Sequence, residues 1–224
     1  MAEQLILNLP VRPALGRDDF FVSDGNAGAV AGIEAWQDWP HGKMVLVGPE
    51  ASGKTHLAHV WAALSGAQMI AAPDLPDADI PTLAQGPVAV EDAHLIAGDR
   101  TAEDALFHLH NLTLADGHAL LVTARSAPHL WGLTLPDLAS RMQGTLLTEL
   151  RAPDDALLSA VLMKLFADRQ LSPSPDTIPY LARRIERSFA AARETVEALD
   201  RAALAHGRAI TRRLAARVLD NRGE

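Results

Sequence analysis

The first two thirds of the chain alternate short apolar runs with longer segments of helical periodicity. The short runs cover residues 44–47, 68–72, 88–92, 119–123 and 145–150. The continuous apolar runs at 44–47 and 119–123 predict strands that are buried on both faces, as in a parallel sheet, and the other three runs predict further strands. The segments between them predict helices over 26–39, 54–64, 101–115 and 135–142, with Thr101 as the N-cap of the third, and a loop with a short helix over 73–86.

The pattern changes near Ala152. From Pro153 onward the periodicity predicts only helices, over residues 154–169, 176–187, 190–206 and 211–221. Strands alternating with helices, followed by helices alone, predict an α/β core with a parallel sheet flanked by helices and a helical lid domain after it. Pro10 and Pro13 oppose a helix at the start. We therefore expect an extended arm (1–18), an α/β core (19–152) and a lid domain (153–224).

A phosphate-binding motif joins the strand at 44–47 to the helix that follows. It is a complete G-x-x-x-x-G-K-[ST] pattern, formed by Gly48, Pro49, Glu50, Ala51, Ser52, Gly53, Lys54 and Thr55. The glycines let backbone N–H groups converge on phosphate oxygens, and the N-terminus of the helix adds positive potential. Lys54 would bind the β- and γ-phosphates, and the Thr55 hydroxyl would ligate Mg²⁺. The sequence therefore predicts a P-loop protein that binds a nucleoside triphosphate.

Two carboxylates and a hydroxyl end the neighbouring strands. Glu91 and Asp92 close the run at 88–92, where P-loop proteins place an acidic residue for Mg²⁺ and a neighbour that polarises the attacking water. We assign Glu91 to the metal and Asp92 to the water. Thr123 ends the next strand and would sense the γ-phosphate. A surface Glu-Asp pair and a plain strand-end Thr are the alternative interpretations.

Charge and composition limit the partners. The net charge of −8 disfavours direct DNA binding, which depends on excess Lys and Arg. Residues 176–224 hold ten Arg against seven Asp and Glu, which indicates either a solvated helical face or an arginine-rich lid over phosphates. The absence of Cys excludes disulfides. Without a long apolar run or a signal-peptide pattern, we expect a cytoplasmic protein that does not enter the membrane.

The order and spacing of these motifs resemble the AAA+ core of the DnaA/Hda family. The resemblance rests on residues 48–55, 88–92, 121–128 and the Leu138-Ala139-Ser140-Arg141 run, and it covers nearly the whole chain. It implies ADP or ATP with Mg²⁺ as the ligand. The family's adenine-side segment corresponds to Phe21, Val22 and Asn26, and His56 follows the phosphate loop. The chain ends soon after the lid helices, so we expect no helix-turn-helix domain like that of DnaA itself.

The resemblance also implies roles for two arginines. Arg141 matches the family's arginine finger, which reaches into the nucleotide site of a neighbouring subunit and stabilises transition-state charge. A surface ion-pair Arg is the alternative interpretation. The lid arginine that normally faces the nucleotide is replaced by Ala190. Arg193 lies one turn later and is a candidate nucleotide contact, and the sequence leaves open whether it substitutes for that arginine. Loss of the lid arginine argues against efficient self-hydrolysis and favours stably bound ADP.

The N-terminal arm resembles the peptide by which replication proteins dock on the β sliding clamp of DNA polymerase III. In the run Gln4-Leu5-Ile6-Leu7-Asn8-Leu9, Gln4 would form hydrogen bonds while Leu5, Leu7 and Leu9 present apolar side chains to a groove. Packing of the arm on its own domain is the alternative. A two-fold clamp would strengthen weak single-arm binding by bivalency.

Three functions follow from these motifs. The first is a regulator that binds adenine nucleotide, docks on the sliding clamp and promotes hydrolysis of DnaA-bound ATP, so that replication initiates less often. The second is an autonomous AAA+ ATPase, such as a helicase loader. The third is a docking module that binds nucleotide without catalysis. The sequence leaves a homo-oligomer open.

Overall fold

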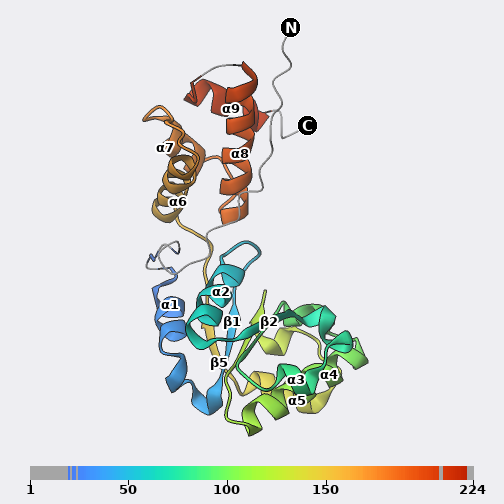
Figure 1. The fold of residues 1–224 in the computed structure, drawn as a ribbon. Helices are drawn as coiled ribbons and strands as arrows, with labels where there is room; N and C mark the ends of the chain where they lie inside the picture. The colour runs from blue at the N-terminus through green and yellow to red at the C-terminus, as the bar shows by residue number, and fades with distance from the viewer. Residues whose placement is uncertain (1–19, 21, 24, 207–208, 221–224) are drawn as a thin grey trace.

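The computed structural model describes residues 20, 22–23, 25–206 and 209–220. The predicted N-terminal arm, with Gln4, Leu5, Leu7 and Leu9, lies outside these residues, as does Phe21. In the described part, five parallel strands form one sheet in the order β2-β3-β4-β1-β5 (Figure 1). The strands are β1 (Lys43–Val47), β2 (Gln68–Ala71), β3 (Val88–Glu91), β4 (Leu120–Ala124) and β5 (Leu146–Glu149). The predicted parallel α/β fold is confirmed.

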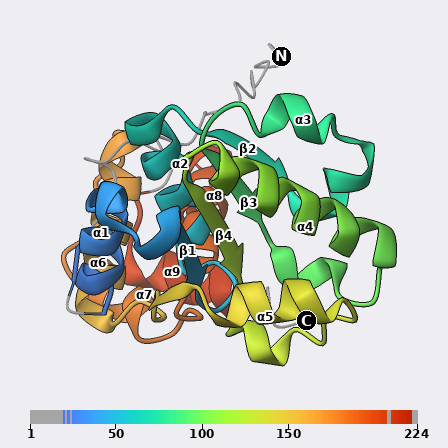
Figure 2. The ribbon, with the colours of Figure 1, turned by 90° about the horizontal axis from the view of Figure 1, so that it is seen from below.

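Helices cover both faces of the sheet. The core helices are α1 (Ala27–Glu34), α2 (Lys54–Ser65), α3 (Ile80–Leu83), α4 (Arg100–Ala115) and α5 (Pro136–Gln143). Helices α1 and α2 pack on one face, and α3, α4 and α5 pack on the other (Figure 2). Short 3-10 turns, Ala72–Asp77 before α3 and Ala93–Ile96 and Pro128–Leu130 after β3 and β4, complete the connections.

The alternation of side chains along β1 explains why the central strands are apolar throughout. Met44 and Leu46 join the core on the α1–α2 face, whereas Val45 and Val47 join the core on the α3–α5 face. Successive residues of a strand point to opposite faces, so a strand covered on both sides needs apolar residues at every position. All five residues of β1 are buried, including Lys43 at its start, which is the exception to this apolar pattern.

A separate helical unit follows the sheet. Its helices are α6 (Asp155–Asp168), α7 (Thr177–Ala182), α8 (Phe189–His206) and α9 (Arg212–Asp220). They enclose their own apolar core, in which Phe166, Leu162 and Leu199 are almost completely buried. This lid domain stands over the end of the sheet from which the N-terminus of α2 projects (Figure 1). None of the helices in the described residues is long and apolar enough to cross a membrane.

The helix predicted over 26–39 is wrong in its second half. Helix α1 ends at Glu34, and 3-10 turns at Trp36–Asp38 and Pro40–Gly42 follow. Trp39 is extended because a residue before proline avoids the helical conformation. Its ring stacks on Trp61 with centroids 5.3 Å apart, and its Nε1 donates to the Gly32 carbonyl at 2.7 Å. Packing against α2 therefore shapes this segment, which local periodicity does not reveal.

Two other boundaries differ from the prediction. Helix α4 begins at Arg100, and its N-cap is Asp99, whose Oδ1 accepts from the N–H groups of Thr101 and Ala102 at 3.0 and 3.2 Å. Thr101 is not the cap because it already lies in the first turn. Helix α7 ends at Ala182, five residues before the predicted end, and Arg183 to Ser188 lead into α8.

One buried carboxylate ties α4 to the segment before α5. Glu103 has no exposed surface. It accepts hydrogen bonds from the N–H groups of Gly98, Thr134 and Leu135 and from the Thr134 hydroxyl, at 2.6 to 2.9 Å. Burial raises the pKa of Glu103, but the bonds from Thr134, Gly98 and Leu135 outweigh it and hold the pKa below its ordinary value. The ionised carboxylate therefore anchors the loop.

We predict that Glu103→Gln lowers the free energy of unfolding by about 1–3 kcal/mol, because the amide NH₂ faces donors that lose their acceptor. Because the folded-state pKa is depressed, the stabilisation is present above the ordinary Glu pKa and is lost as pH falls through the folded-state value. The difference in free energy of unfolding between the wild-type protein and Glu103→Gln should therefore shrink below about pH 4. Urea unfolding at a series of pH values measures this difference. Asp104→Asn is the matched control, because Asp104 forms only an exposed ion pair with Arg100. Equal effects of the two variants would contradict the anchor.

Candidate phosphate-binding site

The phosphate loop starts where the backbone of β1 passes closest to the end of β5. A Cβ at Gly48 would lie 2.5 Å from the Leu150 carbonyl oxygen and 2.7 Å from Ser52 Oγ. The Gly48 N–H also donates to the Ala124 carbonyl at 3.2 Å, which continues the pairing of β1 with β4. Only glycine fits at this position, so the loop begins at a fixed place on the sheet edge.

The rest of the loop turns back toward α2. Ala51 and Gly53 both have left-handed backbone conformations, with φ of 55° and 99°. These turns bring the chain to α2, which begins at Lys54 and runs for twelve residues. The N–H groups of its first turn and its dipole therefore face the loop, which is the arrangement that binds phosphate at helix N-termini.

Lys54 is held inside the loop. The side chain is buried, and its Nζ donates to the carbonyl oxygens of Gly48 and Pro49, both at 2.8 Å. Burial lowers the pKa of Lys54; Asp92, Glu50 and Glu91 raise it, and Arg125 lowers it further. The ammonium group therefore lies among the carboxylates that end β3 and the loop's own Glu50.

The predicted acidic pair lies at the same edge of the sheet. Strand β3 ends at Glu91, and Asp92 takes a left-handed conformation with φ of 55° instead of continuing the strand as predicted. The Asp92 N–H donates to the Thr123 hydroxyl at 3.1 Å. Thr123 therefore fixes the main chain at Asp92, a role that its position alone did not indicate.

The donor set fits a magnesium ion held together with phosphates. Glu91 Oε1 is buried and has no hydrogen-bond partner among the described residues, and Thr55 is exposed at the first turn of α2. No group of three or more His, Cys, Asp or Glu that could hold a metal ion occurs in the described part. Mg²⁺ usually keeps several waters and takes one or two protein ligands beside substrate phosphates. Thr55 and Glu91 match that requirement.

Two further polar residues, an arginine and a histidine, belong to this site and were missed from the sequence. Arg125 follows β4 and pairs with Glu50 of the loop, with Nη2 to Oε2 at 2.9 Å. His94 follows Asp92, and both of its ring nitrogens are buried without a partner among the described residues. Burial lowers the pKa of His94, Asp92 opposes this, and Arg125 and Lys54 lower the pKa further. The available signal was their position just after strands that end at the loop.

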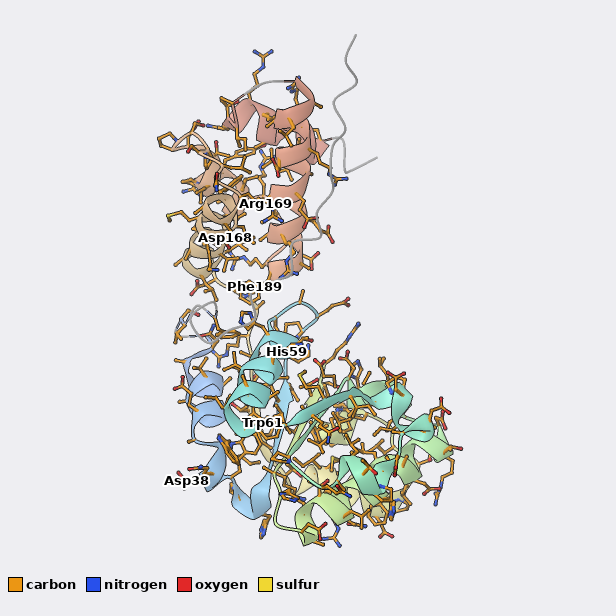
Figure 3. All side chains as sticks on the ribbon, in the orientation of Figure 1. Asp38, His59, Trp61, Asp168, Arg169 and Phe189 are labelled. Carbon is orange, nitrogen blue, oxygen red and sulfur yellow. The ribbon has the colours of Figure 1, made fainter. Side chains whose placement is uncertain are left out.

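The lid domain contacts the phosphate loop directly. The Phe189 N–H, at the start of α8, donates to the Ala51 carbonyl at 3.2 Å. The rings of Phe189 and Phe20 lie against Gly53, at 3.1 and 3.2 Å from where its Cβ would be. Figure 3 shows Phe189 at the junction of the lid and the core. A conformational change in the phosphate loop would therefore be transmitted to α8.

The remaining predicted nucleotide contacts are spread around this junction. Val22 is half exposed, and Asn26 is buried with its Oδ1 accepting from the Ser23 N–H at 2.7 Å. His56, on α2, packs edge to face with Phe20 at a centroid distance of 5.1 Å. Ala190 and Arg193 are exposed on the first turns of α8, and Arg193 is one helical turn beyond Phe189. Their roles in binding remain predictions.

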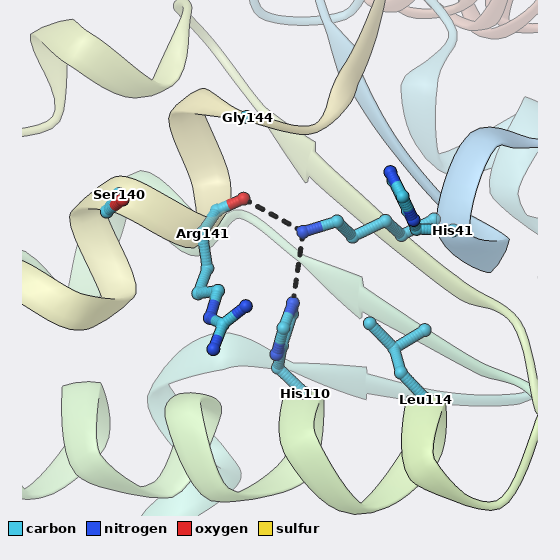
Figure 4. A pocket seen from close by; sticks show the side chains of 7 residues that line it. His41, His110, Leu114, Ser140, Arg141 and Gly144 are labelled. Atoms are coloured by element: carbon cyan, nitrogen blue, oxygen red, sulfur yellow. Dashed lines mark hydrogen bonds between the residues drawn. The ribbon is translucent and has the colours of Figure 1, made fainter.

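Arg141 lies away from the phosphate loop. Its carbonyl oxygen accepts from Lys43, the first residue of β1, whereas the loop follows the last residue of that strand. At about 3.3 Å per residue, β1 separates the two ends of the sheet by about 13 Å. The Arg141 side chain lines a pocket with His41 and His110 at this opposite end (Figure 4). It therefore does not join Lys54 and Glu91 within one molecule.

The sheet order, the phosphate loop after β1 and the helical lid define the AAA+ P-loop fold. No protein-family model matches the chain. Domain III of the Thermotoga maritima replication initiation protein DnaA superposes with a TM-score of 0.80 at 16% identity, covering 95% of this chain and 98% of that one. The likeness in fold is therefore to a DnaA-like AAA+ domain.

Two further structures show the same fold. A replication initiator DnaA bound to AMPPCP and single-stranded DNA gives a TM-score of 0.72 at 18% identity, over 84% of this chain and 65% of that one. A variant of Thermotoga maritima RuvB gives 0.72 at 16% identity, over 92% and 72%. The chain thus spans less than two thirds of the nucleotide-bound DnaA, and the likeness establishes the fold alone.

We predict that Gly53→Ala weakens nucleotide binding at least tenfold. The new Cβ would meet the rings of Phe20 and Phe189, and the φ of 99° disfavours any side chain. Titration with a fluorescent ADP analogue measures the affinity. Gly28→Ala is the matched control, since nothing lies within 4 Å of its Cβ and it sits in helix α1. An unchanged affinity for Gly53→Ala would show that the loop conformation does not matter for binding.

Proposed function

We propose that the protein is an Hda-like regulator: it binds an adenine nucleotide with Mg²⁺, docks on the polymerase sliding clamp and promotes hydrolysis of ATP held by DnaA. The observation that carries nucleotide binding is the loop itself. A Gly48 that admits no Cβ, a Lys54 held against the loop carbonyls and an unpartnered Glu91 oxygen converge on one edge of the sheet. This is a cradle for a polyphosphate and its metal.

The residues of the site would bind different parts of the nucleotide and its metal. Backbone N–H groups at the start of α2 would bind phosphate oxygens, and Lys54 would exchange the carbonyls of Gly48 and Pro49 for the β- and γ-phosphates. Thr55 and Glu91 would hold Mg²⁺, which neutralises phosphate charge when bound. Asp92, fixed by Thr123, would orient a water near the γ-phosphate.

The position of Arg141 supports action on a neighbour's nucleotide. Arg141 is exposed at the end of the sheet opposite the phosphate loop, so a second AAA+ subunit must bring its nucleotide there. A guanidinium placed on a transferring phosphoryl group stabilises its developing charge. In this proposal the neighbour is DnaA. The alanine at position 190 favours regulation over self-hydrolysis, because no lid arginine faces the protein's own nucleotide from that position.

Docking on the clamp rests on the sequence of the arm. Gln4, Leu5, Leu7 and Leu9 would extend into an apolar groove of the clamp, which would concentrate the protein on replicated DNA. Regulation would then act after a clamp has been loaded.

An autonomous ATPase is the second candidate. The observation that favours it is that Lys54, Glu91 and Asp92 lie at one edge of the sheet with Thr123 and His94. Groups that could bind phosphate, hold Mg²⁺ and orient a water are therefore all supplied by a single subunit. A helicase-loader function predicts ATP turnover that single-stranded DNA stimulates in the absence of DnaA. The regulator predicts slow turnover without DnaA that DNA does not change.

We predict that Lys54→Ala weakens ADP and ATP binding by about 10–100-fold, because a charge-assisted bond to phosphate contributes about 1.5–3 kcal/mol. Isothermal titration calorimetry measures both affinities. Lys164→Ala is the control, since Lys164 lies on α6 and pairs with Asp168. Wild-type affinity for Lys54→Ala would refute the phosphate site.

We predict that Arg141→Ala lowers the release of phosphate from ATP-DnaA by at least ~100-fold, in line with other arginine fingers. The assay combines ATP-DnaA, DNA-loaded clamp and this protein. ADP binding to the variant should be unchanged, because Arg141 is remote from the loop.

Two controls separate the finger from docking. Arg100→Ala removes an exposed arginine of α4 and should leave phosphate release unchanged. Replacing Gln4 and Leu7 by Ala should abolish binding to the clamp. It should therefore lower phosphate release only under conditions in which stimulation of DnaA depends on the clamp. If Arg141→Ala stimulates phosphate release from ATP-DnaA fully, the assignment of Arg141 as an arginine finger is contradicted. If the wild-type protein does not stimulate this release, the proposed regulatory function is refuted.

A further inference from the structure

A cationic pocket opens at the end of the sheet opposite the phosphate loop. It has a volume of about 350 Å³, and its lining includes His41, Lys43, His110, Ser140 and Arg141. Four elements contribute to it: the 3-10 turn Pro40–Gly42, the start of β1, the second half of α4 and the end of α5. Figure 4 shows the Arg141 side chain extending alongside the His110 imidazole. The proposed nucleotide site uses none of these residues except Arg141, and that one only toward a neighbour.

Lys43 places a positive charge at the bottom of this pocket. The residue is only 7% exposed, and its Nζ lies 3.0 Å from the Arg141 carbonyl oxygen and 3.2 Å from His110 Nε2. Dashed lines in Figure 4 mark both contacts. Both partners are neutral acceptors, so neither compensates the charge. A buried ammonium group without a carboxylate is unfavourable unless an anion reaches it.

His110 is a second buried polar group of the pocket. It is 3% exposed, and its Nδ1 lies 3.1 Å from Asn111 Oδ1, while its Nε2 faces Lys43. Burial lowers the pKa of His110, the Asn111 contact opposes this, and Lys43 and Arg141 lower it further. The pKa of Lys43 is lowered by burial and by Arg141. Burial and the neighbouring cations therefore favour the neutral imidazole, and the positive charge of the pocket is that of Lys43 and Arg141.

Compensation from the protein itself is missing at this place. Among the residues that the structure describes, no Asp or Glu lines the pocket. Elsewhere in the described part, Arg100, Arg125, Arg169 and Arg187 all have carboxylate partners at 2.8 to 3.2 Å. The chain has a net charge of −8, yet none of the carboxylates in the described residues lines this cavity.

We propose that Lys43, His110 and Arg141 form a phosphate-binding pocket, in which the donors from β1 and α4 complete the site of the arginine at the end of α5. The ligand is a phosphate group, whose oxygens would accept from the Lys43 and Arg141 cations and whose negative charge would favour protonation of His110 as a third donor. It comes either from the nucleotide of a neighbouring AAA+ subunit or from free inorganic phosphate. The first source rests on the proposed function, whereas the second does not.

The direct test is a titration of the ADP-saturated full-length protein with inorganic phosphate. Bound ADP keeps phosphate out of the loop at Lys54. The readout is the Cε1–H signal of the His110 imidazole in NMR spectra, assigned by its loss in His110→Gln. We expect a saturable shift in the wild-type protein and at least a tenfold weaker apparent affinity in Lys43→Met. Lys164→Met is the matched control, because it removes a lysine of α6 and should leave the titration unchanged.

The second arm uses the reconstitution of ATP-DnaA, loaded clamp and this protein. If the phosphate belongs to a neighbour's nucleotide, Lys43→Met should slow phosphate release at least tenfold while ADP affinity stays at the wild-type value. If free phosphate is the ligand, Lys43→Met should leave phosphate release unchanged and the NMR titration should still detect binding. Arg141→Ala should weaken the apparent affinity for inorganic phosphate in both cases.

The outcomes distinguish this pocket from the proposed function. A saturable His110 shift that Lys43→Met weakens supports the pocket even if DnaA is not stimulated at all. No shift, together with phosphate release in Lys43→Met equal to wild type, overturns the pocket even if Arg141→Ala is inactive. Thermal unfolding would reveal whether Lys43→Met fails to fold. In that case, phosphate release is measured with His110→Gln and the phosphate titration is measured with Arg141→Ala.

Discussion

The close approach of Gly48 to Leu150 is the constraint on which the rest of the site depends. It joins the end of β1 to the chain leaving β5, so the loop that follows has a fixed start on the sheet edge. From there the left-handed turns at Ala51 and Gly53 deliver the chain to α2 with its N-terminus facing the loop. The Lys54 side chain then folds back into the loop, because its ammonium group donates hydrogen bonds to the carbonyls of Gly48 and Pro49. The geometry of phosphate binding is thus set by backbone packing before any ligand is considered.

The parallel sheet gives the molecule two chemically different ends. At the carboxyl ends of the strands lie Lys54, the acidic pair Glu91 and Asp92, and Arg125 in its ion pair with Glu50. At the amino end of β1 lie Lys43 and the pocket that Arg141 lines. Positive charge is balanced by carboxylates at the first end and is unbalanced at the second. In the proposed function, this difference lets one subunit bind its own nucleotide at one end and meet a neighbour's at the other.

The lid is connected to the phosphate loop by contacts of Phe189, the first residue of α8. Phe189 supplies both a backbone hydrogen bond to Ala51 and a ring against Gly53, where Phe20 also packs. Arg193 follows one turn later and is exposed on α8. Movement of the loop on binding would therefore act on α8 through Phe189, and through it on the apolar core that α8 shares with α6 and α9.

The sequence by itself determined the parallel α/β core, the helical lid and the identity of the phosphate loop, because buried strands need apolar residues at every position and the loop needs its glycines and lysine in a fixed order. It failed where tertiary contacts overrode local pattern, as in the segment after Glu34 that Trp39 pulls onto Trp61. Only the tertiary structure decided that Arg125 and His94 join Lys54, that Thr123 holds the Asp92 main chain, and that Lys43 and His110 meet Arg141. These residues are far apart in the chain, and no local periodicity records which strand ends and helix faces the fold brings together.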